Sequence, residues 1–280
     1  MRRIILITII VIIICMLFAC SENNVVTVEQ ANFNRLIEQI DEIERLTAEY
    51  SEGNVFSNTL IYIRGKRYND IYWNTLAGAS DTEFEDYVLS NQELESSAIR
   101  DIKQIVIPST RDIVDFVHTV GTMNMALNGQ ASSDLGGFAG DITQLVRDIK
   151  NTQGDFDMIY NAAAAQFGQP GGFDYADVFA NIDAVNMVAN YNNNSRVFSI
   201  ILKDYYNNLT HTSRIEQYLY NEFGGTVFTL EELRDIVHQR VIDNLYIKVL
   251  FAKDNLSMVK YYDHIKACCY VYADYLLQGK

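Results

Sequence analysis

Apolar residues recur at intervals of three and four along most of this chain, which is the spacing of amphipathic helices. The first such stripe predicts a helix that ends near Gly53. Its members are Phe33, Leu36, Ile37, Ile40, Ile43 and Tyr50. Thr27 and Gln30 have the spacing of a capping box at the start of this helix. The next apolar run, residues 56–63, fits a strand or a helix, and we favour a helix because its neighbours are helical.

Pro108 interrupts a second apolar run, residues 102–107, and the chain is expected to restart as a helix over about residues 110–127. Apolar residues from Leu135 to Ile149 predict the next long helix, which begins in a glycine-rich stretch.

The C-terminal half predicts helices over residues 175–191 and 195–206. Capping boxes follow at Ser213 with Glu216 and at Thr229 with Glu232, the second opening a helix that reaches about Lys253. A last helix is expected over about residues 257–277.

These patterns predict an all-α fold, a globular bundle of about nine or ten helices. The chain has only two prolines and no convincing run of alternating strand residues. We expect one extracytoplasmic domain over residues 29–280, with the glycine-rich stretch near 166–172 as the candidate subdivision.

The first twenty residues have a different pattern. Arg2 and Arg3 precede an unbroken apolar run, Ile4 to Phe18, and a small residue stands before Cys20. This order is typical of a secretion signal, and the run is short for a membrane span, which needs about 20 residues. An uncleaved signal anchor and an ordinary secreted protein cut nearby are the alternatives.

Residues Leu17-Phe18-Ala19-Cys20 resemble the lipobox of bacterial lipoproteins. The resemblance implies cleavage of residues 1–19 as a signal peptide, lipidation of the Cys20 thiol and acylation of the new amine, palmitate being the expected acyl group. Residues 20–28 would then be a short linker, and the domain would face away from the cytoplasm on a cell membrane or an outer membrane. Beyond residue 20 the chain resembles no family that we can name.

The net charge of the chain limits the kinds of molecule that it is expected to bind. The formal net charge is -14, and removal of Arg2 and Arg3 with the signal makes it -16. An acidic domain is repelled by nucleic acid and by anionic lipid surfaces, so nucleic acid is not expected as a partner. The expected partners are the bilayer, through the acylated N-terminus, and an envelope protein or a glycan.

Four cysteines do not make a disulfide framework here. Cys15 leaves with the signal and Cys20 takes the lipid, so only the neighbours Cys268 and Cys269 remain. We predict that they are small helix residues of which at least one is buried.

One constellation has the residue types of acid and base chemistry. Asp115 and His118 are neighbours on the predicted helix over residues 110–127, and Asp141 or Asp134 lies at the start of the next long helix. A carboxylate can orient a histidine and raise its basicity, and a second carboxylate could complete an acid and base pair or a metal site. The alternative is a solvated helix face.

Asp174, Asp177 and Asp183, with nearby Asn181 and Asn186, suggest an oxygen-rich site for a divalent cation. The segment lacks the spacing of an EF-hand loop, and the alternative is that Asp174 and Asp177 cap and lead a helix. No cofactor is predicted, and a divalent cation is the alternative.

The segment from Arg64 through Arg67 to Trp73 is the only local basic cluster and holds the only tryptophan. A cationic turn with aromatic residues could bind a glycan or an anionic group. The alternative is a turn between two helices with Trp73 in the core.

The sequence favours a non-catalytic binding or interaction module, because the strong catalytic and nucleotide-binding motifs are absent. The alternative function is a lipid-tethered cell-envelope hydrolase or metal-dependent enzyme that uses Asp115, His118 and Asp141. An enzyme requires these groups to converge, whereas a binding module should present an apolar or aromatic surface elsewhere.

Overall fold

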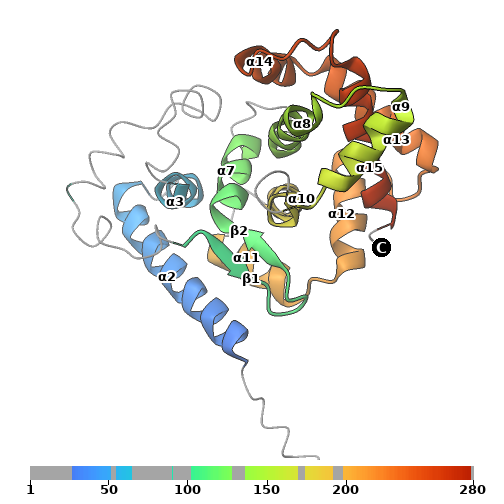
Figure 1. Ribbon diagram of the computed structural model, residues 1–280. Helices are drawn as coiled ribbons and strands as arrows, with labels where there is room; N and C mark the ends of the chain where they lie inside the picture. The colour runs from blue at the N-terminus through green and yellow to red at the C-terminus, as the bar shows by residue number, and fades with distance from the viewer. Residues whose placement is uncertain are drawn as a thin grey trace, which may run out of the picture.

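The computed structural model describes residues 27–51, 55–64, 90, 102–127, 136–169, 174–191 and 198–278. The predicted signal peptide and most of the linker lie outside these ranges. Helices dominate the fold (Figure 1). In chain order the elements are α2 (Val28–Tyr50), α3 (Val55–Arg64), β1 (Gln104–Val106), β2 (Ile113–Asp115), α7 (Phe116–Leu127), α8 (Gly136–Ile149), α9 (Phe156–Gln166), α10 (Tyr175–Ala189), α11 (Phe198–Asn207), α12 (His211–Phe223), α13 (Leu230–Asp243), α14 (Leu245–Lys253) and α15 (Tyr262–Gln278). The predicted all-α class is confirmed.

The N-terminal helices form as the sequence predicts. Thr27 caps α2 by accepting a hydrogen bond from the Gln30 amide at 3.1 Å, and the predicted apolar stripe is buried from Phe33 to Ile43. Residues 55–64 are helical, so the choice of helix for the ambiguous apolar run was right.

The prediction of a helix beginning near residue 110 is wrong at its start. β1 and β2 form an antiparallel hairpin, in which Ile105 pairs with Val114, and α7 begins only at Phe116. The turn holds Arg111 at a φ of 64°, a left-handed conformation that a helix excludes. Each strand has three residues, too few for their alternating burial to stand out in the sequence.

Three further helix boundaries differ from the prediction. The expected long helix ending near Lys253 breaks at Asn244, whose backbone is extended and which separates α13 from α14. Thr210, rather than Ser213, is the N-cap of α12, with Ser213 as the reciprocal partner of its capping box. The last helix begins at Tyr262, five residues later than expected.

Helix α10 lies between two hydrophobic clusters and is buried on both sides (Figure 1). Its Ala180, Ala184 and Met187 belong to the cluster formed with α2, α3, the hairpin, α7 and α11. Its Val178 and Ile182 belong to the cluster formed with α8, α9 and α12 to α15. The predicted subdivision near 166–172 falls between α9 and α10.

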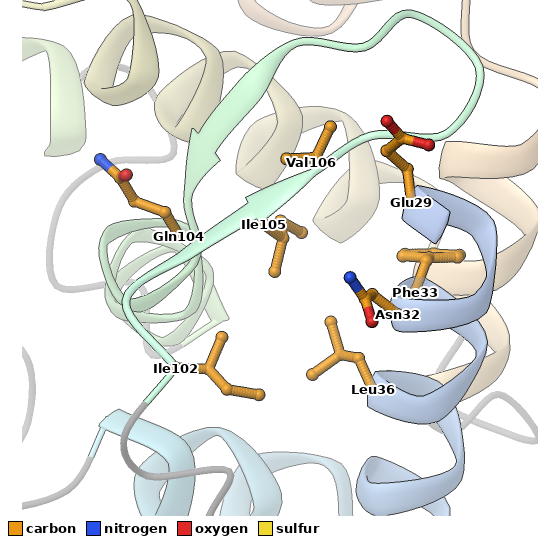
Figure 2. Close-up of a pocket in the computed structure, with 8 residues that line it drawn as sticks. All are labelled: Glu29, Asn32, Phe33, Leu36, Ile102, Gln104, Ile105 and Val106. Carbon is orange, nitrogen blue, oxygen red and sulfur yellow. The ribbon is translucent and has the colours of Figure 1, made fainter. Parts of the chain in front are cut away.

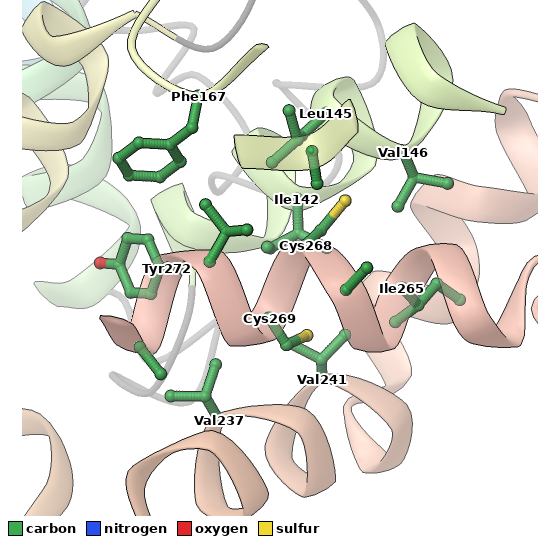
Figure 3. Close-up of a cluster of buried hydrophobic side chains, with 14 of the residues drawn as sticks. Ile142, Leu145, Val146, Phe167, Val237, Val241, Ile265, Cys268, Cys269 and Tyr272 are labelled. Carbon is green, nitrogen blue, oxygen red and sulfur yellow. The ribbon is translucent and has the colours of Figure 1, made fainter. Parts of the chain in front are cut away.

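The second cluster is built around α15. Cys268 and Cys269 are both fully buried free thiols, which confirms their prediction as buried helix residues. Figure 3 shows them on different sides of α15, with Cys268 near Ile142 and Cys269 near Val241. They act as small apolar side chains that let α8 and α13 approach α15.

A buried charge joins α10 to α12 and to the hairpin. Arg214 of α12 is fully buried, and its Nε and one terminal nitrogen donate to the Asp183 carboxylate of α10 at 2.8 and 3.0 Å. Its other terminal nitrogen donates to Asp112 in the hairpin turn, and the guanidinium lies 4.3 Å over the Phe179 ring. Tyr205 donates to Asp183 at 2.7 Å, so the buried carboxylate accepts three hydrogen bonds.

Replacing Arg214 by Met should unfold the protein more easily, because Asp183 would stay buried without its counter-charge. We expect a loss of about 3–5 kcal/mol in the free energy of unfolding, measured by urea denaturation. Arg147→Met is the control, because its pair with Asp254 spans 3.4 Å at an exposed site and should cost under about 1 kcal/mol. Equal losses in the two variants would contradict the assigned role of the buried pair.

Candidate functional site

Asp115 and His118 meet at the start of α7. Asp115 ends β2, and its Oδ1 accepts a hydrogen bond from the backbone amide of His118 at 2.8 Å. The carboxylate therefore caps the first turn of α7, as an N-cap aspartate does. In this arrangement Asp115 orients the backbone of His118 and makes no hydrogen bond to its ring.

Asn181 of α10 connects His118 to Asp141. The His118 Nε2 lies 2.8 Å from the Asn181 Oδ1, which also accepts from the Thr122 hydroxyl at 3.0 Å. Because this oxygen can only accept, Nε2 carries a proton. The Asn181 amide nitrogen donates to the buried carboxylate of Asp141 on α8. The structure thus brings Asp141 and His118 together through a residue that sequence reasoning assigned to a cation site.

Asp177 faces the other ring nitrogen. Its Oδ1 lies 3.7 Å from the His118 Nδ1, and both side chains are partly exposed, 20% for His118 and 27% for Asp177. Asp177 and Asn181 are four residues apart on α10, so they lie on one face of that helix. This face of α10 supplies the groups that face both ring nitrogens of His118.

The charges of this cluster are coupled. Burial opposes a charge on the His118 ring, but the nearby carboxylates of Asp141, Asp177 and Asp115 outweigh it and raise the pKa of His118. Burial raises the pKa of Asp141 to about 7 although His118 acts against the shift, and it raises the pKa of Asp177 to about 6. The cluster therefore binds and releases protons near neutral pH.

The hydrogen bonds of the cluster join α7, α8 and α10 across the middle of the molecule. Nε2 of His118 and the carboxylate of Asp141 are both engaged with Asn181, and the partly exposed pair of His118 and Asp177 is the portion that reaches solvent. Within the ranges that the structure describes, no group of three or more histidine, cysteine, aspartate or glutamate side chains has an arrangement suited to a metal ion.

The three aspartates of the predicted cation site have separate roles. Asp174 is the N-cap of α10 and accepts from the Asp177 amide at 3.0 Å. Asp177 faces His118, and Asp183 binds Arg214. Asp174 and Asp183 are about 13 Å apart along the helix axis, at 1.5 Å per residue. The structure does not bring Asp183 to the other two carboxylates.

The remaining predicted positions are not described at the level of side chains. Cys20, Arg67, Trp73 and Asp134 lie outside the described residues, and for Arg64 only the backbone, at the end of α3, is described.

An apolar groove lies between the N-terminal half of α2 and β1, away from His118. Its volume is about 270 Å³. Figure 2 shows Phe33 and Leu36 of α2 facing Ile102 and Ile105 across it. Three of its described lining residues are polar: Glu29, Asn32 and Gln104. Sequence reasoning missed this site because its two walls are about 70 residues apart and one of them is the unpredicted hairpin.

One lining residue, Val106, is an exposed apolar side chain, and two more exposed apolar residues adjoin lining residues: Ile113 pairs with Val106 and Val28 precedes Glu29. Val106 is 39% exposed, its cross-strand partner Ile113 is 51% exposed, and Val28 at the start of α2 is 74% exposed. An apolar groove with such side chains beside it is the kind of surface that binds a partner.

Fold and site together define a globular protein of the all-α class, with a hydrogen-bonded network around His118 and Asn181 inside and an apolar groove at its surface. The chain belongs to the YkzU family: the family model described as YkzU uncharacterised protein matches residues 117–279. The match includes His118, Asp141 and Asn181 and leaves out the walls of the groove.

An uncharacterized protein YkzU of Bacillus subtilis (strain 168) is 29% identical to this chain over 100 residues. The alignment covers 35% of this chain and 58% of that protein, so it spans less than two thirds of the relative's length. No solved structure matches the chain. Among the described helices, none combines the length and apolar character needed to cross a membrane.

The stability of the folded protein should fall as pH rises from about 4 towards 7. Asp141 has an ordinary pKa of 3.8 and a folded-state pKa of about 7, so the folded state binds more protons within that window. The raised pKa of His118 acts in the same direction as pH rises past its ordinary value of 6.5. Thermal unfolding from pH 4 to pH 8 measures the slope.

Asp141→Asn should reduce this slope, with a change on the order of 4 kcal/mol across the window, because the pKa rises from 3.8 to about 7 and each pKa unit corresponds to about 1.4 kcal/mol. Asp263→Asn, which removes an exposed carboxylate, is the control and should keep the wild-type slope. Identical slopes for Asp141→Asn and wild type would exclude Asp141 as the titrating group.

Proposed function

We propose that this protein is a membrane-anchored, extracytoplasmic lipoprotein that acts as a non-catalytic interaction module and holds a hydrophobic segment of an envelope protein in the groove between α2 and β1. The observation that carries the proposal is the groove itself. Its volume of about 270 Å³ is below the roughly 300–1,000 Å³ of pockets that enclose a drug-sized ligand. A space of this size suits two or three apolar side chains of a partner.

The position of the groove relative to the predicted anchor supports the proposal. The groove lies at the start of α2, which begins at Val28, eight residues after the predicted lipidated Cys20. Eight residues of chain reach at most about 28 Å. The groove would therefore act close to the bilayer, where other anchored or embedded proteins expose their segments.

Charge selects the kind of partner. An acidic chain is repelled by anionic lipid, so the bilayer surface itself is a poor occupant of the groove. Glu29 is the one charged side chain among the described residues that line the groove. It favours a partner segment that carries a lysine or arginine beside its apolar residues.

The hydrolase or metal-dependent enzyme that would use Asp115, His118 and Asp141 remains the second candidate, supported by the convergence of His118 with Asp141 and Asp177. It is less favoured because these groups are already hydrogen-bonded within the protein. Asp115 accepts from a backbone amide, and Asn181 is hydrogen-bonded to both the Nε2 of His118 and the carboxylate of Asp141.

Cys20→Ser should remove the anchor. In the source cell, the wild-type protein is expected in the membrane fraction and should be labelled by radioactive palmitate. The Cys20→Ser protein is expected as a precursor or a released form, and neither should carry the palmitate label. Cys15→Ser is the matched control, because Cys15 lies within the expected signal. Palmitate labelling that survives Cys20→Ser would contradict the assignment.

The groove is tested by photo-crosslinking in living cells, with p-benzoylphenylalanine placed at Asn32 or Gln104, one on each wall. We expect both positions to give an adduct with the same protein, identified by mass spectrometry, and Val106→Glu to abolish both adducts. Gln239, exposed on α13, is the control position. Absence of an adduct, or an equal adduct at Gln239, would overturn the groove as the binding surface.

A further inference from the structure

A second surface depression runs along the outer face of α12, on residues that neither the groove nor the His118 cluster uses. It consists of two adjoining pockets of about 170 and 400 Å³, and Asn190 and Gln217 line both of them. The shared lining makes them one continuous trough. We call it the polar trough for its amides and carboxylates, although Met187, Ile201 and Leu209 also line the smaller pocket, and it lies within residues 117–279, which match the family model.

One stripe of α12 forms much of the trough. Its members are Ser213, Glu216, Gln217, Tyr220 and Asn221. Positions separated by three, four, seven and eight residues share a helix face. The opposite face of α12, which includes Arg214 and Tyr218, is buried, so packing of that face fixes the orientation of the stripe.

The amide groups of the trough are held in place by the protein. Asn190 and Asn208 donate from their side-chain nitrogens to the backbone oxygens of Asn186 and Asp204, at 2.9 and 3.0 Å. Asn221 donates to the Asn186 Oδ1 at 3.0 Å, and Asn186 is fully buried. Within the described part of the chain, the side-chain oxygens of Asn190, Asn208 and Asn221 have no partner, so they stand ready to accept hydrogen bonds from a ligand.

The charge of the trough excludes anionic ligands. Among the residues that the structure describes along the trough, none is a lysine or an arginine, and the charged ones are Asp204 and Glu216. A phosphate or a nucleic acid would meet the negative charge of Asp204 and Glu216 without a cationic side chain among the described lining residues. A ligand rich in hydroxyl donors and without negative charge fits this lining.

Tyr220 adds a surface for stacking. Its side chain is 64% exposed at the edge of the trough, among amides and carboxylates. An exposed aromatic ring beside hydrogen-bonding groups can cover the apolar face of a sugar while its neighbours bind the hydroxyls.

We propose that the polar trough binds a neutral glycan chain, with Tyr220 stacking on a sugar ring and Gln217, Asn190 and Asn221 binding its hydroxyls. The trough is distinct from the apolar groove in its residues and in its chemistry, so the two sites stand or fall independently. A glycan of the cell envelope would be the ligand that an extracytoplasmic protein meets.

The test measures binding of three neutral oligosaccharides, chitotetraose, cellotetraose and maltotetraose, to the full-length protein in detergent by isothermal titration calorimetry. We expect at least one of them to bind with a Kd of about 1 mM or lower. Tyr220→Ala and Gln217→Ala should each weaken this binding about tenfold, which corresponds to 1.4 kcal/mol. Circular dichroism checks that both variants, which alter exposed residues, are folded.

Tyr262→Ala is the matched control, because Tyr262 is 44% exposed on α15 and does not line the trough. Its affinity should equal that of the wild type. The proposal is overturned if none of the three sugars binds, or if binding is unchanged by Tyr220→Ala and Gln217→Ala in folded protein.

Discussion

A cation that is removed from water needs an opposite charge and hydrogen bonds, and Arg214 obtains both from two distant parts of the chain. Asp183 of α10 takes two of its donor nitrogens and Asp112 of the hairpin turn takes the third. Because a mispaired guanidinium would be costly at this depth, α10, α12 and the hairpin have one favourable relative arrangement. The ring of Phe179 packs against the guanidinium of Arg214, and the hydroxyl of Tyr205 donates to Asp183, so both members of the ion pair have further partners.

The ion pair with Arg214 fixes the rotation of α10, and this rotation positions both the His118 cluster and the polar trough. With Asp183 turned to Arg214, Asp177 and Asn181 are turned to α7 and α8, where they hold His118 and Asp141. One turn further along, Asn186 faces α12 and anchors Asn221 in the polar trough. A helix buried on two sides can carry such polar residues only because each one has a partner.

Local signals sufficed for the helices. Capping residues and apolar stripes predicted α2 and α10, because each is set by residues within a few turns, whereas α3 was predicted only from its helical neighbours. The hairpin could not be predicted, because two strands of three residues carry little pattern and are stabilised by packing on α2, α7 and α10. The burial of Arg214 could not be predicted either. An arginine in a helix is expected at the surface unless a buried acidic partner is known.

The sequence grouped Asp115, His118 and Asp141, but it predicted neither their hydrogen bonds nor the part taken by Asn181 and Asp177. Helical spacing placed Asp115 near His118, yet the carboxylate caps the backbone, because β2 rather than a helix precedes α7. Asn181, the residue that joins His118 to Asp141, is 63 residues from the histidine, and no local pattern connects them. The residues near Asp183 in the sequence suggested a ligand of a metal cation, whereas its counter-ion in the structure is Arg214, 31 residues away.

On the proposed function, the anchor changes what the groove must supply. Two apolar side chains buried in it contribute about 3–6 kcal/mol, which alone corresponds to a dissociation constant in the range of about 40 μM to 6 mM. Confinement of both partners to one membrane raises their effective concentration, so such an affinity is enough for association there and too weak for capture in solution. A small groove beside an anchor is therefore a selective arrangement, because a partner must share the membrane as well as the apolar segment.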